Sequence, residues 1–267
     1  MADPQTLIAR PAPAPDAWVE RYYAASPAAR AIPWDELRNR PLTAREHAVV
    51  REFYGARYQV ESDYNRGHPW HSVISAFRVR LLQAAFPRGL GRVVDAGCAS
   101  GETVLAFRDV GIDCVGFDIC PDLHDACYDR ARPWLRMGRV DAMPFSERDE
   151  LTTLVSYDVF EHVPIDRLER LPVELARLGI RQISCVIAAD TGSAGHITIQ
   201  DTDWYLELFA RAGFRLMTEL TPLLQRVPVP GAWNERTRTP VWLPYDRTGE
   251  PRNGWNQVPG QLFLTRD

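Results

Sequence analysis

The feature that most constrains this chain is a buried strand that runs directly into a glycine turn and a helix. Residues 93–107 read VVDAGCASGETVLAF. The apolar run predicts a strand, the two glycines a tight turn, and the next residues a helix. Such a unit places helix N–H groups beneath a nucleotide-like ligand. The dinucleotide fingerprint is G-x-G-x-x-G, whereas this turn has glycine only at its first and last positions, so it matches an NAD loop poorly.

Short strands and helices alternate after this turn. We expect strands at 92–96, 114–118, 138–142, 151–158, 181–190, 214–220 and 260–266, and helices at 102–110, 119–131, 165–178 and 201–213. Repeated alternation of this kind predicts an α/β fold: a Rossmann-like, doubly wound sheet with helices on both faces.

The sequence divides into a lead, a helical cap and this α/β core. Residues 1–15 are expected to be a flexible lead and residues 16–88 a helical N-terminal cap, with helices at 16–26, 43–55 and from Trp70 to about 86. Thr43 and Gly55 are expected to begin and end the second helix, and 58–72 to form a loop. Residues 89–267 form the core, with an insertion at about 222–259. Its large aromatic residues predict a folded segment rather than a disordered one.

Composition excludes several classes of function. All 31 basic residues are arginine, so a lysine Schiff base is impossible. The net charge of −4 argues against a nucleic-acid partner. The chain has neither an apolar run long enough for a membrane span nor a secretory signal, so a cytoplasmic location is expected. Five cysteines without a C-x-x-C pair predict free buried thiols. Because the short cluster Cys120, His124 and Cys127 lacks a second half, no metal is expected.

Carboxylates follow three successive strands of the predicted sheet. These residues are Asp95, Asp118 and Asp141. In an open parallel sheet the ligand binds outside the carboxyl ends of the strands. An acidic rim repels a pyrophosphate but suits a ligand with ribose hydroxyls, an amino group and a positive charge.

Residues 89–220 resemble the class I S-adenosylmethionine-dependent methyltransferases. VVDAGCASG is similar to the family's D-x-G-x-G-x-G turn, with Ala99 in place of the middle glycine. VGFDI, VDAMPF and SYDVFEHVP match the next three signatures in order and spacing. HITIQDTDWYLELFARAGF resembles the segment after strand five of many small-molecule methyltransferases. The resemblance implies a seven-stranded sheet whose last strand runs antiparallel beside strand five.

The same resemblance implies residues that bind S-adenosylmethionine. It assigns the methionine end to Asp95 and Gly97, the shape of the turn to Cys98 and Gly101, the ribose to Asp118, the adenine to Ile119, Asp141 and Ala142, and the sulfonium side to Ser156 and Tyr157.

The favoured function is methyl transfer to a small-molecule acceptor, such as a secondary metabolite. His162 and His196 follow adjacent strands and are candidate bases, although a structural role for either fits equally well. Candidate acceptor-binding residues lie mainly in the aromatic segment 58–72; they are Tyr64, Arg66, His68, Trp70 and, after strand five, Trp204, which also fits a core position.

Two other functions remain open. One is a macromolecule methyltransferase, disfavoured because Ser-Tyr-Asp-Val at 156–159 replaces the N/D-P-P-Y turn common in enzymes that methylate amino groups of bases and protein amides. The other is a protein that binds S-adenosylmethionine without transferring its methyl group, because a fold does not fix a function. A metal-dependent catechol-type mechanism is set aside, since Asp190 is followed by Thr191 and not by asparagine.

Overall fold

A mixed seven-stranded sheet organises the part of the chain that the computed structural model describes. That part comprises residues 34–65, 69–120, 127–188, 195–217, 228–234, 239–242 and 262–267. The strands are β1 (Arg92–Ala96), β2 (Cys114–Asp118), β3 (Leu135–Met137), β4 (Leu151–Tyr157), β5 (Gln182–Val186), β6 (Arg215–Leu216) and β9 (Leu262–Thr265), in the order β3-β2-β1-β4-β5-β9-β6. The first five pair in parallel, and β9 is antiparallel to both β5 and β6. The expected sheet with an antiparallel last strand beside strand five is confirmed.

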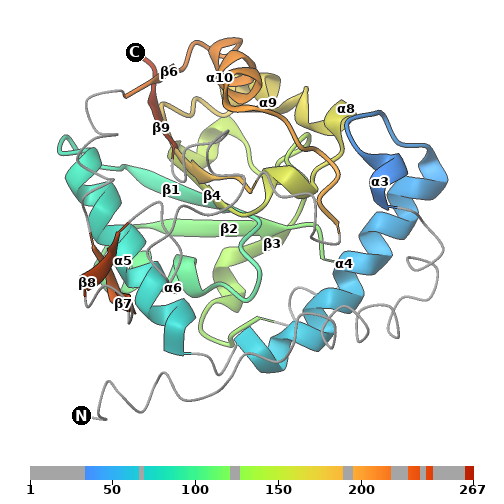
Figure 1. Cartoon of the computed structure of the whole chain (residues 1–267). Coiled ribbons are helices and arrows are strands. Elements are labelled where there is room, and N and C mark those ends of the chain that lie inside the picture. Colours follow the sequence, from blue (N-terminus) through green and yellow to red (C-terminus); the bar gives the residue numbers. More distant parts are fainter. Residues whose placement is uncertain are drawn as a thin grey trace.

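Helices cover both faces of the sheet because its strands are apolar on both sides (Figure 1). In β1, Val93 faces a core shared with α5 (Pro69–Ala85) and α6 (Glu102–Asp109). Val94 faces the opposite core, shared with α8 (Ile165–Leu168), α9 (Leu171–Arg177) and α10 (Thr202–Ala210). Successive side chains of a strand point to opposite faces, so one short strand supplies both cores.

The third strand lies earlier in the chain than expected. It is Leu135–Met137, and the predicted strand 138–142 is instead a turn closed by a bridge between Arg139 and Ala142. Pairing with β2 ends where the Gly138 N–H donates to the Asp118 carbonyl at 2.8 Å. Pro144 packs directly on Gly138, where a Cβ would lie 2.4 Å from the proline Cδ, so the chain folds back there. The prediction was wrong because VDA has a strand-like composition but forms a turn.

The single helix expected at 165–178 is two helices, α8 and α9. Pro172 lies in the first turn of α9 and has no N–H to continue the hydrogen bonding of α8. The other strand predictions hold with shorter ends, since β5 stops at Val186 and β6 at Leu216. Of the helix expected at 119–131, residues 121–126 lie outside the described residues, and the described residues 119–120 and 127–131 are not helical.

The N-terminal helices partly contradict the sequence prediction. The described part contains α3 (Trp34–Leu37), α4 (Ala44–Asn65) and α5. Thr43 begins α4 as expected: its hydroxyl accepts the Glu46 N–H at 3.3 Å, and the Glu46 carboxylate accepts the Thr43 N–H at 2.7 Å. Gly55 does not end the helix, and the expected loop 58–72 is largely helical. A glycine costs a helix only about 1 kcal/mol, which the helix-forming residues around it outweigh. Residues 1–33 lie outside the described part.

The cap packs on the loop that follows β5. Its buried cluster comprises Trp34, Leu37, Leu42, Val50, Phe53 and Tyr54 together with Ile197. The Asn39 side chain also accepts the Ile199 N–H at 2.8 Å. These contacts fix α3 and α4 over the loop after β5.

Within the insertion, β7 (Pro228–Asn234) and β8 (Thr239–Trp242) pair as a separate antiparallel sheet. β7 lies against α5, as Figure 1 also shows. The rest of 222–259 lies outside the described residues. Among the helices of the described residues, none has the length and apolar character to cross a membrane.

Candidate active site

The glycine turn after β1 is held by β2. The Gly97 and Cys98 N–H groups both donate to the Phe117 carbonyl, at 2.9 and 3.1 Å. Gly97 has φ +78°, and a Cβ there would lie 2.4 Å from a methyl carbon of Val159. Gly101 has φ +91°, and its Cβ would lie 2.6 Å from the Cβ of Ala131. Both glycines are therefore required by conformation and by space.

Ala99 takes a backbone conformation that favours glycine. Its φ is +46°, which costs a residue with a Cβ about 1–2 kcal/mol. Its N–H donates to the Asp118 carboxylate at 3.1 Å. The alanine at the family's middle glycine position is thus accommodated with strain, and the turn keeps its contact with β2.

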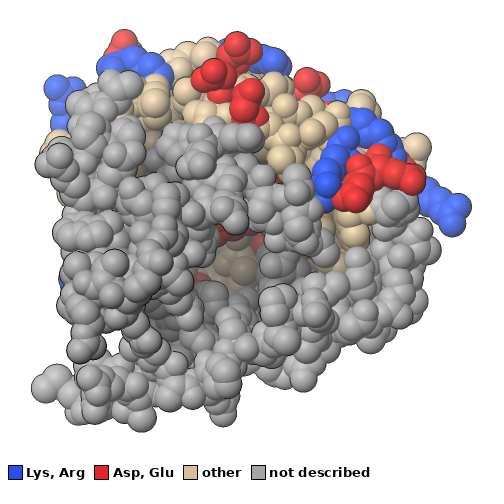
Figure 2. Space-filling view, viewed as in Figure 1, with Lys and Arg blue, Asp and Glu red and all other residues tan. Residues whose placement is uncertain are grey.

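Two buried carboxylates lie at this turn, those of Asp95 and Asp118, each 3% exposed. The Asp118 oxygens accept the N–H groups of Ala99 and Cys120, both at 3.1 Å, so the carboxylate is oriented by backbone. Burial raises the pKa of Asp95 to about 7; the positive charge of Arg78 opposes this rise, and the negative charges of Asp118 and Glu102 add to it. Figure 2 shows a hollow in the viewed face with acidic atoms visible inside it.

Arg78 is a site residue that sequence reasoning missed. It lies on α5, and its guanidinium carbon is 3.9 Å from the centroid of the Tyr157 ring. A guanidinium nitrogen is also 4.0 Å from the Asp158 carboxylate. The sequence offers no signal for it beyond a single arginine beside an apolar helical stripe. Burial raises the pKa of the Tyr157 phenol well above its ordinary range.

Ser156 lies inside the sheet and not on a ligand surface. It is fully buried, and its hydroxyl donates to the Ala96 carbonyl at 3.1 Å. The side chain therefore ties the end of β4 to the end of β1. Its neighbour Tyr157, on the other face of the strand, lies beneath Arg78.

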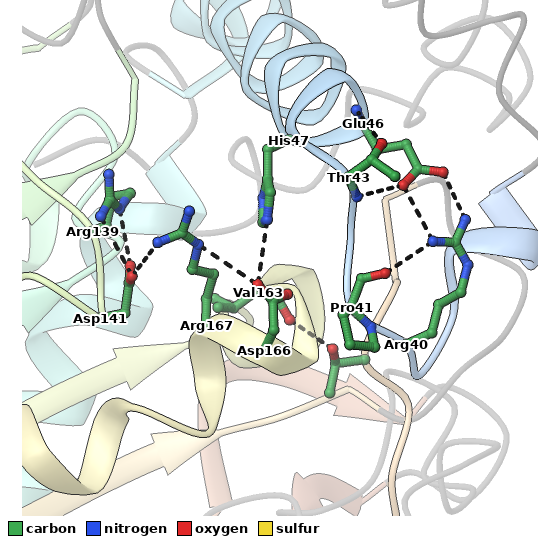
Figure 3. A network of polar contacts seen from close by, with 11 residues as sticks. Arg40, Pro41, Thr43, Glu46, His47, Arg139, Asp141, Val163, Asp166 and Arg167 are labelled. Carbon is green, nitrogen blue, oxygen red and sulfur yellow. Dashed lines mark hydrogen bonds and ion pairs between the residues drawn. The ribbon is translucent and has the colours of Figure 1, made fainter.

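Asp141 is the centre of an ion-pair network (Figure 3). Arg139 and Arg167 hold its carboxylate at 2.9 and 2.7 Å, and its side chain is 2% exposed. Burial raises the pKa of this carboxyl, but the two arginines outweigh burial and hold the pKa below its ordinary value. Arg167 also lies 3.9 Å from Asp166, which is 3.4 Å from His47 on α4. The network therefore connects the third strand-end carboxylate to the cap.

The two predicted histidines lie together at the ends of β4 and β5. The ring centroids of His162 and His196 are 4.6 Å apart, with the rings edge to face. His162 Nδ1 lies 2.7 Å from the Tyr54 hydroxyl and 3.1 Å from the Gly195 carbonyl. His196 is 6% exposed, and Glu161 beside them is fully buried. Sequence reasoning placed both histidines but missed Tyr54 and Glu161.

Residues 68–178 match the model of the methyltransferase domain family. The match covers the glycine turn, both buried carboxylates and His162. Residues 68–178 are a methyltransferase domain, in agreement with the resemblance to the class I S-adenosylmethionine-dependent enzymes. The sheet order described above agrees with this family, as does the antiparallel strand beside β5.

The fold of this methyltransferase is similar to that of several solved structures. Magnesium protoporphyrin IX methyltransferase from Synechocystis PCC 6803, solved with bound S-adenosylhomocysteine, is 14% identical; the match covers 93% of this chain and 99% of that chain with a TM-score of 0.50. At this identity the likeness shows the fold alone.

Two further similar structures show the range of the neighbours. A complex between the Haloferax volcanii Trm112 methyltransferase activator and a methyltransferase is 20% identical, covering 80% of this chain and 95% of that chain at a TM-score of 0.46. A structure described under the conversion of a disulfide bond into a thioacetal group during echinomycin biosynthesis is 18% identical. The match covers 52% of this chain and 68% of that chain with a TM-score of 0.41. No curated protein sequence matches the chain significantly.

The structure of the methyltransferase also places the remaining predicted residues. Cys98 is buried in the turn, and all five cysteines are free and buried, as expected. Ile119 packs against the cap cluster. The Ala142 N–H donates to the Arg139 carbonyl at 3.1 Å. Trp204, on α10, packs against the core as a partly buried side chain.

The predicted acceptor residues of the cap lie on two helices. Tyr64 is in the last turn of α4 and Trp70 in the first turn of α5. Arg66 and His68 lie between these helices, outside the described residues.

Proposed function

We propose that this enzyme binds S-adenosylmethionine at the ends of β1 and β2 and transfers its methyl group to a small-molecule acceptor. The observation that supports the proposal most strongly is the pair of buried carboxylates at a glycine turn. Asp95 and Asp118 are each 3% exposed without a lysine anywhere in the chain. Buried carboxylates are costly unless a cation or hydrogen-bond donors compensate them. The ammonium and ribose hydroxyls of the cofactor supply both.

Each end of the cofactor has a complementary group in this arrangement. Asp95 binds the ammonium, and Asp118, already oriented by two backbone N–H groups, accepts the ribose hydroxyls. Arg78 supplies the positive charge for the cofactor's carboxylate, since it is the cation that acts on Asp95. Ile119 and the 139–142 turn border the adenine. Because the arginines hold the Asp141 carboxylate, we expect the adenine amino group to be contacted by the 139–142 turn as a whole and not by this carboxylate alone.

The acceptor binds on the cap side of the strand ends. The segments 58–72 and 222–259, with Tyr64, Arg66, His68 and Trp70, form its pocket in this proposal. Loops and appended segments carry the specificity of a shared scaffold. The helical ends of α4 and α5 and the packing of β7 on α5 support it, because they bring both segments to α5.

Methyl transfer is an in-line displacement in which the acceptor atom bonds to the methyl carbon as the carbon–sulfur bond breaks. The bonding pair stays on sulfur, which leaves neutral S-adenosylhomocysteine, and a hydroxyl acceptor gives up its proton. The enzyme therefore mainly supplies position and exclusion of water. His162 and His196 are the proposed proton acceptors, because they lie together and Val159, three residues before His162, packs on Gly97 of the glycine turn. A general base of this kind increases the reaction rate by about 10²–10⁴-fold.

Calorimetry with S-adenosylhomocysteine tests the cofactor site. Asp118→Ala removes a charge-assisted, two-oxygen contact, so binding should weaken by about 1.5–3 kcal/mol. Asp109→Asn is the matched control, because Asp109 is an exposed aspartate on the far end of α6 that pairs with Arg130. Unchanged affinity in Asp118→Ala, or tight binding of NAD, contradicts the proposal. Transfer to a small molecule is shown by a product 14 mass units heavier than the acceptor.

A further inference from the structure

We propose that Glu161, His162 and His196 bind a divalent transition-metal ion, with Zn²⁺ the preferred ion. One ligand atom from each residue lies within 4.8 Å of the other two. No metal was expected from the sequence and this set was not considered, because the adjacent Glu161 and His162 and the distant His196 match no metal-site spacing. The binding site is argued from its own geometry, and only its part in catalysis rests on the proposed function.

Backbone hydrogen bonds hold the three residues together. Glu161 and His162 end the short helix η4 (Phe160–His162) after β4, and His196 lies in the segment after β5. The Ile197 and Thr198 N–H groups both donate to the Glu161 carbonyl at 2.9 Å. These two bonds join the segments at the point where the side chains meet, so the spacing of the cluster is set by the backbone.

Two oxygen atoms lie beside Nδ1 of His162 and orient its ring. Its Nδ1 lies 3.1 Å from the Gly195 carbonyl, which accepts a hydrogen bond from the tautomer that carries its hydrogen on Nδ1. The Tyr54 hydroxyl donates to the same carbonyl at 3.1 Å, and its oxygen lies 2.7 Å from Nδ1. The tautomer with its hydrogen on Nδ1 would carry the ring lone pair on Nε2, the atom that would bind an ion. Histidines that bind metals characteristically donate their other N–H to a carbonyl or similar acceptor, which fixes the ring.

The chemistry and burial of the cluster fit a transition metal. Two imidazoles and one carboxylate are the ligands of zinc sites that keep a position open for water or substrate. Glu161 is fully buried and His196 is 6% exposed, so an ion here is shielded from water. Ligand atoms about 2.1 Å from a tetrahedral ion lie about 3.4 Å apart. Binding an ion would therefore draw the ligand atoms closer together than their present spread of up to 4.8 Å.

The position of the cluster relates it to methyl transfer. Val159, two residues before Glu161, packs directly on Gly97 of the cofactor turn. An ion at the cluster would thus lie close to the cofactor, where it lowers the pKa of an acceptor hydroxyl. Under this inference the histidines assist loss of the proton through the ion rather than as direct bases.

Titration of the chelator-stripped enzyme with Co²⁺ tests the site, because bound Co²⁺ has a visible spectrum that reports its ligands. We expect one equivalent to bind with intensified absorption bands, to be displaced by Zn²⁺, and to persist in excess Mg²⁺. His196→Gln and Glu161→Gln should lose this binding, and Tyr54→Phe should weaken it about 10–100-fold by freeing the His162 ring. His47→Gln is the matched control, since His47 also lies beside a carboxylate, that of Asp166 at 3.4 Å.

The outcomes separate this inference from the proposed function. Failure of Co²⁺ to bind, or equal binding in His196→Gln and the wild type, overturns the metal site, whereas the cofactor site is tested separately by Asp118→Ala calorimetry. Circular dichroism and affinity for S-adenosylhomocysteine show whether each variant is folded. If the ligand variants unfold, X-ray absorption of the Co²⁺-loaded wild type decides: two imidazole ligands support the site, and fewer overturn it.

Discussion

Replacing Asp95 with asparagine should stabilise the fold in a pH-dependent way. Burial raises the pKa of Asp95 in the folded protein to about 7, against 3.8 in an unfolded chain. The folded state therefore binds this proton more tightly than the unfolded state does. As pH rises from about 3.8 to 7, the unfolded carboxyl ionises first, and the free energy of unfolding of the wild type falls. Above pH 7 both states are ionised and the loss is complete.

The size of the effect follows from the shift in pKa. A difference of about 3 pKa units at about 1.36 kcal/mol per unit gives about 4 kcal/mol. Asparagine does not titrate, so Asp95→Asn lacks this loss. The difference in free energy of unfolding between the variant and the wild type should therefore increase with pH. At pH 8 it should be about 4 kcal/mol larger than at pH 4. Any constant cost of burying the amide shifts both ends equally and leaves the pH-dependent part unchanged.

Urea unfolding at pH 5, 6, 7 and 8 measures this difference. The variant should unfold at increasingly higher urea than the wild type as pH rises, and it should lose affinity for S-adenosylhomocysteine. Asp109→Asn, on the exposed end of α6, should show neither effect. A constant difference between Asp95→Asn and the wild type at pH 5 and pH 8 would mean that the buried carboxyl is ionised throughout, which would refute the argument. As pH increases toward 7, the affinity of the wild type for the cofactor should also increase, by up to about tenfold per pH unit.

Three further substitutions test the turn and the cap. Gly97→Ala should cost about 1–3 kcal/mol of unfolding free energy more than Gly111→Ala in urea titrations, because both have positive φ but only Gly97 has Val159 in the way of a Cβ. Ala99→Gly should raise the melting temperature, since it removes the strain of a left-handed alanine backbone, which costs about 1 kcal/mol. An unchanged melting temperature would show that Ala99 is not strained. Thr43→Ala should lower the free energy of unfolding by about 1 kcal/mol through loss of the α4 cap, with Thr43→Ser as the variant that keeps it.

The sheet was predictable because most of its strands can be identified from the local sequence. β1 and β2 have the expected bounds, since each has a short apolar stretch followed by an aspartate at or near the end of the strand. The turn at 138–142 was not predictable, because its composition is strand-like and its conformation depends on the packing of Pro144 on Gly138. The extension of α4 beyond Gly55 likewise depends on the surrounding helix formers.

The site was predictable only where its residues follow strand ends. Asp95 and Asp118 lie at the carboxyl ends of their strands and the two histidines come after theirs, so their placement comes from topology. Arg78 lies within a helix, and its position over Tyr157 is a tertiary contact. The pairing of Tyr54 with His162 joins residues 108 positions apart. No local pattern in a single sequence records such contacts.

The three strand-end carboxylates look alike in sequence but differ in charge environment, and this difference indicates where the cofactor's positive charge binds. Arg139 and Arg167 hold the pKa of Asp141 below its ordinary value, so its charge is already compensated and serves to connect the core to α4 through Asp166. Burial instead raises the pKa of Asp95, and Arg78 offsets this only in part. A ligand cation gains most beside the carboxylate whose charge is least compensated. We therefore infer that the ammonium end of the cofactor binds at Asp95 and its uncharged adenine lies toward the Asp141 turn, which fixes the direction of the cofactor across the sheet edge.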